Sequence, residues 1–401
     1  MRLYRMELYK LCHKKSFAAG FLFVLLIGLF FFYDDVRLQS CTVNGMEYTG
    51  LKAIRANRQI TEDFRGVLTD EKVTQIIEKY GFPDEEFDLY NRMKGNFLNT
   101  FVMDYASNGY NNGWDDYQIA TEAVPLADSL LGRYYAASDM EITLGYYDGW
   151  RSFLNNFGVL MLGVSLLILY IISIVFSEEE QVGMKSLLFT TKEGPSKDVL
   201  AKITAAFSIS VGVWLLAVSF CLLPYCMIYG TDGLHCVASL ATKWSFLETP
   251  LLMQPLGAYL AEVLLVSLLA VLELCAITIC VSACCHSSFY AIVAAGICYV
   301  LPFFGFLLYQ LGWAMLLFCS VQHPLPSGPL MVCHGILYLL RGFIYSSPVY
   351  LLLAQNGLTE LSRTNSIGEM KHVYIVLAIA AMLFVLCTIG AYRRYRRPQK
   401  L

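Results

Sequence analysis

The sequence predicts an all-α polytopic membrane protein with six transmembrane helices, cytoplasmic N- and C-termini and a large extracellular insertion between spans 1 and 2. Of its 401 residues, 57% are hydrophobic and only 15% are charged, whereas soluble domains carry about 25% charged residues. Several windows also reach the roughly 20 apolar residues that a spanning helix needs. Ten-residue strands of alternating hydrophobicity, which would indicate a membrane barrel, do not occur in the sequence.

Residues 1–16 are predicted to form a cytoplasmic amphipathic helix at the membrane interface, because apolar and aromatic residues alternate with basic ones. The alternative is a basic tail that only sets orientation. Residues 17–33 form the first predicted span. A basic start before an apolar run is also typical of a signal peptide, but the end of this run, LFFFYDD, offers no small-residue cleavage site. We therefore expect the run to be retained as a signal anchor.

Residues 34–150 are predicted to be an extracellular domain, because they contain 20 acidic and 10 basic residues and short cytoplasmic loops favour Lys and Arg. Helical spacing is clearest in residues 69–80, where VTQIIEKY follows an acidic start. Two aromatic motifs, YNNGWDDY and GYYDGW, could contact a ligand or the membrane interface. The alternative is ordinary aromatic packing in a modest core.

Residues 151–401 are predicted to contain spans 2 to 6. Those spans are expected at residues 157–176, 203–227, 257–281, 288–309 and 373–392. The apolar stretch 330–354 is interrupted by Arg341 and Pro348, so we expect an extracellular pair of short interfacial or re-entrant helices there. Basic residues at the N-terminus and the C-terminal RRYRRPQK place both ends inside by the positive-inside rule, which requires an even number of spans.

Residues 177–199 are too polar to cross a membrane and are predicted to form a short cytoplasmic surface helix. Ser177 followed three residues later by Glu180 has the spacing of a capping box. Gly194 and Pro195 are expected to stop the segment before the next span. Its apolar positions recur at helical spacing and would need a partner; they are Met184, Leu187 and Leu188.

This loop resembles the cytoplasmic loop of ATP-binding-cassette type-2 permeases. The opening MELYKLCHKKSF, the insertion before span 2 and the segment SFLETPLLMQPLGAYL also resemble parts of that family. Where the family often has an arginine after the turn, this chain has EGPSK. The resemblance implies that the loop is a coupling helix that docks on an ATPase subunit. The matching positions are Glu179, Gly183, Leu187, Leu188, Thr190, Thr191, Ala201 and Lys202.

The resemblance implies the membrane-spanning permease subunit of an ATP-driven exporter. No GxxxxGK[ST] phosphate-binding loop occurs in the sequence, so ATP and Mg would be bound and hydrolysed by a separate ATPase chain, and this chain itself is not expected to be an enzyme or to carry a cofactor. A second permease subunit, identical or related, and the lipid bilayer are the other expected partners; nucleic acid is not. The absence of an N-x-[ST] acceptor is compatible with a bacterial plasma membrane.

Two carboxylates, Glu262 and Glu273, fall in the span predicted at 257–281. Intramembrane carboxylates usually face a bundle interior or a water-filled path. Glu273 could therefore contact substrate, or it could bind a proton in an ion-coupled secondary transporter, although the sequence shows no internal repeat of the kind such transporters have. It could also bond to a neighbouring Ser, Tyr or Asn to fix helix register. A membrane receptor or assembly factor with a sensing ectodomain is the third hypothesis.

Overall fold

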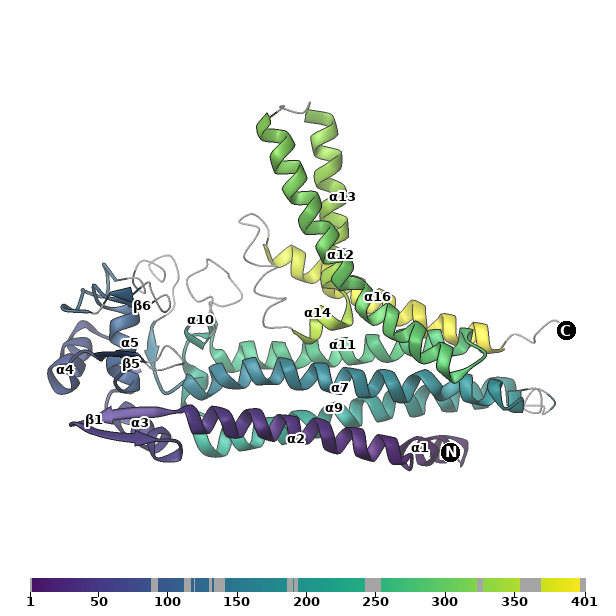
Figure 1. Ribbon diagram of the computed structural model, residues 1–401, viewed down its shortest axis with the longest axis horizontal. Coiled ribbons are helices and arrows are strands. Elements are labelled where there is room, and N and C mark those ends of the chain that lie inside the picture. The colour runs from purple at the N-terminus through teal and green to yellow at the C-terminus, as the bar shows by residue number, and fades with distance from the viewer. Residues whose placement is uncertain are drawn as a thin grey trace. The chain divides into compact units, whose positions relative to one another are not determined.

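The computed structural model is 79% helical and contains six helices long and apolar enough to cross a membrane (Figure 1). It describes residues 2–87, 93–111, 117–118, 120–129, 132, 141–185, 190, 194–241, 254–322, 327–353 and 369–396. The six helices are α2 (Lys15–Leu38), α7 (Asp148–Gln181), α9 (Val199–Tyr229), α11 (Leu256–Cys284), α12 (Ser288–Gln322) and α16 (Glu369–Arg396). Each contains one predicted span, so a mostly helical chain with six helices that could span a membrane is confirmed. The topology, the cytoplasmic termini and the extracellular insertion stay predictions.

The chain divides into two compact units, and each is described by itself. The bundle unit consists of Met1–Ile27, Phe157–Ser219 and Glu262–Leu401. The insertion unit consists of Gly28–Asn156 and Phe220–Ala261. The insertion unit therefore contains the predicted domain 34–150 together with adjoining ends of the long helices.

The bundle unit is organised around α7, whose apolar window is 72% buried against 6% for that of α2. Close packing of α2 on α7 depends on a glycine, because a Cβ at Gly20 would lie 2.8 Å from Leu167 Cδ1. The indole nitrogen of Trp214 on α9 donates to Ser267 Oγ on α11 at 2.9 Å. The predicted amphipathic helix at the N-terminus is present as α1 (Arg2–Cys12).

The segment predicted as a pair of short helices contains α13 (Ser327–Tyr345) and α14 (Pro348–Leu352). Two helices are present, but α13 has 19 residues and is not short. It runs beside α12, which continues well past the predicted end of its span (Figure 1). The break falls at the serines before Pro348, because proline fits the first turn of a new helix and not the interior of an old one.

The insertion unit combines short helices with two-stranded antiparallel pairs, which the all-α prediction did not include. Its helices are α3 (Leu51–Glu62), α4 (Asp70–Tyr80), α5 (Phe97–Tyr105) and α10 (Ala238–Ala241), with a 3₁₀ turn, η2, at Asp232–His235. The pairs are β1 (Ser40–Val43) with β2 (Met46–Thr49), β3 (Gly66–Val67) with β8 (Thr143–Leu144), β4 (Asp84–Phe87) with β5 (Met93–Lys94), and β6 (Tyr110–Asn111) with β7 (Tyr117–Gln118).

Local sequence accounts for two of these elements. The β1–β2 hairpin turns at Asn44 and Gly45, whose φ angles of 51° and 75° match the left-handed positions that a tight hairpin needs. The helix predicted at 69–80 is confirmed as α4, and Thr69 caps it by accepting from Lys72 N.

The motif GYYDGW forms part of the insertion unit's core. Tyr146 and Tyr147 are each 2% exposed and Trp150 is 1% exposed. Both tyrosines make edge-on contacts with Phe97 of α5 at about 5 Å between ring centroids. Of the two readings of this motif, aromatic core packing is therefore confirmed; most of YNNGWDDY lies outside the described residues.

Candidate functional site

A buried ionic cluster joins three segments of the bundle unit that are far apart in the sequence. Lys202 Nζ, near the start of α9, lies 2.7 Å from Glu7 Oε1 on α1 and 2.7 Å from Glu179 Oε1 near the end of α7. It also lies 3.6 Å from Asp198 Oδ1. The Lys202 side chain is 0% exposed, and Lys10 Nζ adds a further contact to Glu179 Oε1 at 2.9 Å. We call these five residues the ionic cluster.

Helix electrostatics explain why the cluster is needed. Glu179 lies at the C-terminal end of α7, where the helix dipole disfavours negative charge, and Lys202 lies near the N-terminal end of α9, where it disfavours positive charge. Placing the two side chains together offsets both penalties. A buried pair of this kind is tolerated only when its charges are well compensated, and α1 supplies Lys10 and Glu7 for that purpose.

Further contacts tie the same end of α7 to the rest of the bundle unit. Glu178 Oε2 accepts from Lys14 Nζ at 2.6 Å. Glu180 contacts Lys185 at 3.1 Å and His286, beside α12, at 2.6 Å. The end of α7 is thus held by groups from the N-terminal segment, from the loop that follows it and from the α11–α12 turn.

The capping box predicted at Ser177 and Glu180 is wrong. α7 continues without a break through both residues, and Ser177 Oγ donates back to Ser173 O within the same helix at 2.9 Å. The stretch SEEEQ contains good helix formers and no breaker, so the span simply extends. The helix ends instead at Gln181, and the turn that follows contains Gly183, whose φ of 72° is the left-handed conformation that glycine favours.

The predicted coupling residues divide into three groups. Glu179 and Lys202 are brought together in the ionic cluster. Gly183, Met184 and Thr190 lie beyond it, and Met184 is 47% exposed. The remaining predicted positions, Leu187, Leu188 and Thr191, lie outside the described residues.

Sequence reasoning missed Glu7, Lys10 and Asp198. One signal was present, because Asp198 and Lys202 have the i,i+4 spacing of a helical ion pair. Glu7 and Lys10 lie on the amphipathic N-terminal helix, where charges are usually solvated. Nothing local marked them as partners of Lys202 and Glu179, which are 195 and 169 positions away.

The two intramembrane carboxylates differ in their surroundings. Glu273 on α11 is 0% exposed, and neither of its oxygens has a hydrogen-bond partner among the described residues. The predicted hydrogen bond from Glu273 to a neighbouring Ser, Tyr or Asn, which would fix the helix register, is therefore not found among the described residues. Glu262, three turns earlier, is partly exposed and has an interaction of its own.

No family model, curated protein or solved structure matches this chain. Within the part of the chain that the structure describes, no group of three or more His, Cys, Asp or Glu side chains could hold a metal ion.

Proposed function

We propose that this chain is the membrane-spanning permease subunit of an ATP-driven exporter, coupled to a separate ATPase through the segment between α7 and α9. The observation that carries the proposal is the ionic cluster, whose residues Glu179 and Lys202 flank that segment. It links both ends of the segment, Glu179 and Lys202, to each other and to α1. A force applied to the segment would therefore reach α7, α9 and α1 together.

The segment also offers a surface on which a partner could act. Val182 is 70% exposed and Met184 is 47% exposed, just past the end of α7. The cluster behind them is buried, so separating its charges would leave an ammonium or carboxylate group uncompensated, at a cost of about 3 to 5 kcal/mol. The ionic cluster therefore holds α1, α7 and α9 rigidly together. Coupling further requires that the ATPase contact the segment differently in its two states.

The remaining parts of the proposal follow from this role. ATP and Mg would be held by the ATPase, the functional unit would contain a second permease subunit, and the complex would reside in the plasma membrane of a bacterium. The segment and both termini would then face the cytoplasm, as the positive-inside rule predicts from the basic residues at both ends.

The test separates docking from coupling. The full chain would be co-expressed with candidate ATP-binding-cassette ATPases and assayed in lipid discs for pull-down and for ATP hydrolysis. Met184→Asp should reduce pull-down at least tenfold, because it places a charge in the proposed docking surface. Met46→Asp, at a residue of similar exposure (58%) in the insertion unit, is the matched control and should leave pull-down unchanged.

Lys202→Met tests the ionic cluster rather than the proposed docking surface. We expect the ATPase still to bind but its hydrolysis to lose any dependence on the permease. Lys10→Met removes only a peripheral ammonium group, which is 39% exposed. This variant should lose part of the dependence of ATP hydrolysis on the permease, and it replaces Lys202→Met if that variant does not insert into the membrane. Failure of the wild-type chain to bind any such ATPase, or equal binding by Met184→Asp, would refute the proposal.

Glu273 favours one second candidate, an ion-coupled secondary transporter. A buried carboxylate without a hydrogen-bond partner among the described residues is suited to taking up and releasing a proton. In liposomes without any ATPase, a proton gradient alone would then drive efflux of a fluorescent amphiphile, and Glu273→Gln would abolish it. An ATP-driven exporter predicts no such flux.

A further inference from the structure

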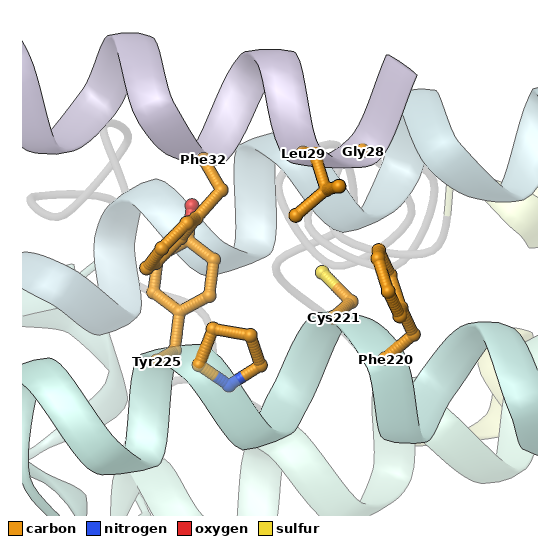
Figure 2. Close-up of a pocket in the computed structure, with 7 residues that line it drawn as sticks. Gly28, Leu29, Phe32, Phe220, Cys221 and Tyr225 are labelled. Carbon is orange, nitrogen blue, oxygen red and sulfur yellow. The ribbon is translucent and has the colours of Figure 1, made fainter. Parts of the chain in front are cut away.

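A shallow crevice lies between α2 and α9 within the insertion unit, and Figure 2 shows its lining. Leu29 and Phe32 reach from α2 toward Cys221, Phe220 and Tyr225 on α9 (Figure 2). Leu29 is 43% exposed, so one side of the crevice opens to the surface of the apolar helices. Pro224 also lines it and lies inside α9.

A carboxyl group, that of Asp35, lies about one helical turn beyond the residues that line the crevice. Asp35 lies three residues after Phe32 on α2, and Tyr229 lies four residues after Tyr225 on α9, so each continues its helix face by one turn. Tyr229 Oη donates to Asp35 Oδ2 at 2.9 Å. The hydroxyl groups of Tyr225 and Ser152 also lie near this carboxyl group.

Among the described residues, the side chain that hydrogen-bonds to Asp35 is Tyr229, which carries a neutral hydroxyl group. Among the described residues, Asp35 forms no ion pair with a lysine, arginine or histidine. Its neighbour Asp34 takes the nearby cation by pairing with Arg37 at 2.8 Å. Arg58, close to the end of α9, donates instead to the backbone oxygen of Ile228 at 3.1 Å. The electrostatic complement of Asp35 is therefore missing from the described chain.

Aromatic rings surround this position. Phe32 and Phe153 both pack edge-on against Tyr225, with centroids 4.9 and 5.4 Å apart. Tyr229 stacks on Tyr225 at 5.5 Å and on Tyr146 at 6.3 Å. Aromatic faces beside a carboxylate are the surroundings that attract organic cations, ammonium groups above all.

We infer that the crevice binds a cationic amphiphile, with its ammonium group at Asp35 and its alkyl chain between α2 and α9. The chain would lie along the open side of the apolar lining, where the bilayer can reach it, and the carboxylate with its aromatic rings would select the positive head. As the class of cargo, this inference rests on the proposed export function. As a binding site, it stands independently of that function.

The test measures protection of Cys221, which lines the crevice, from an apolar maleimide. The full-length protein in lipid discs would be labelled at increasing concentrations of dodecyltrimethylammonium or of dodecyl glucoside, which has the same tail and a neutral head. Peptide mass spectrometry reads each cysteine separately. Cys226, on the same helix, partly buried and outside the crevice lining, is the internal reference.

We expect the ammonium probe to protect Cys221, and not Cys226, at a concentration at least tenfold lower than the glucoside. Asp35→Asn should abolish that preference, and Asp34→Asn, at the ion-paired neighbour, should preserve it. Equal protection by both probes in the wild type would overturn the inference without any substitution. So would a preference that survives Asp35→Asn.

Binding and export can fail separately. The protection experiment needs no ATPase, so a negative result leaves the docking and coupling assays untouched. If the ammonium probe binds at Asp35 while no ATPase docks, the site is a cation-selective amphiphile site in a chain that is not an ATP-driven permease. If the ATPase docks and the probe does not bind, the exporter carries a different class of cargo.

Discussion

The ionic cluster of the bundle unit and the carboxyl group of Asp35 in the insertion unit place charge among apolar helices in opposite ways. In the ionic cluster, Lys202 and Glu179 compensate each other within the chain. At Asp35, the hydrogen bond comes from the neutral hydroxyl of Tyr229, and no ion pair forms among the described residues. Charges that neutralise each other hold helices together, whereas a carboxylate bound only by neutral donors keeps its attraction for an outside cation.

The largest effect is expected from breaking the ionic cluster. Lys202→Met should lower the free energy of unfolding by about 3 to 5 kcal/mol, because it leaves Glu7 and Glu179 without their shared buried cation. Chemical unfolding in mixed micelles would measure it. Lys202→Met combined with Glu179→Leu should recover part of the loss, since two apolar side chains then face each other. If Lys202→Met alone lowers the free energy of unfolding by less than about 1 kcal/mol, the ionic cluster contributes little to stability.

The next effect concerns the ring that holds Asp35. Gly149 lies against Tyr229 so closely that an added Cβ would overlap the ring. Gly149→Ala should therefore cost about 1 to 3 kcal/mol by overpacking. The substitution should also move the Tyr229 hydroxyl away from the Asp35 carboxylate. The ammonium probe would then protect Cys221 with less advantage over the glucoside. Chemical unfolding and the Cys221 protection assay measure these two effects. An unchanged free energy of unfolding together with unchanged protection would contradict the close packing of Gly149 against Tyr229.

A third carboxylate, Asp104 on α5, is buried and only partly compensated. Burial raises the pKa of Asp104 to about 6, and the nearby charge of Arg151 offsets only part of this. One oxygen, Oδ1, is buried without a hydrogen-bond partner among the described residues. The folded state therefore binds this proton more tightly than the unfolded state, so stability falls as the pH rises from about 4 to 6 and stays lower above pH 6.

Asp104→Asn should accordingly stabilise the protein by about 2 kcal/mol at pH 7 to 8. The gain should shrink as the pH falls below 6 and vanish below about pH 3, where the wild-type carboxyl is protonated in both states. Unfolding of both proteins across this range gives the two curves. Parallel curves would show that Asp104 does not titrate as its burial requires.

The smallest effect is expected at Asp34. Its ion pair with Arg37 involves side chains that are 37% and 54% exposed, and surface pairs contribute about 0 to 1 kcal/mol. Asp34→Asn should change the free energy of unfolding by less than about 0.5 kcal/mol. A larger loss would remove Asp34 as the matched control for its neighbour Asp35.

Long apolar runs allowed the helices to be predicted from sequence, but the candidate sites were only partly predictable. Glu179 and Lys202 were identified from the resemblance of their loop, and Glu273 from its position in a span. Glu7, Asp35 and Tyr229 were not identified, because each has an ordinary sequence context near a helix end. The extension of α7 through Ser177 was missed because a capping spacing can also occur inside a continuous helix.

The sequence by itself determined the six apolar helices and the N-terminal amphipathic helix, because hydrophobic length and helical periodicity are local properties of the chain. It also determined the Asn44–Gly45 turn and the Thr69 cap, which depend on a few adjacent residues. Only the tertiary structure decided which charges meet and which are left with neutral donors. Lys202 meets Glu7 across 195 positions, and Tyr229 meets Asp35 across 194. Contacts at such separations depend on how helices pack against one another, which no local pattern records.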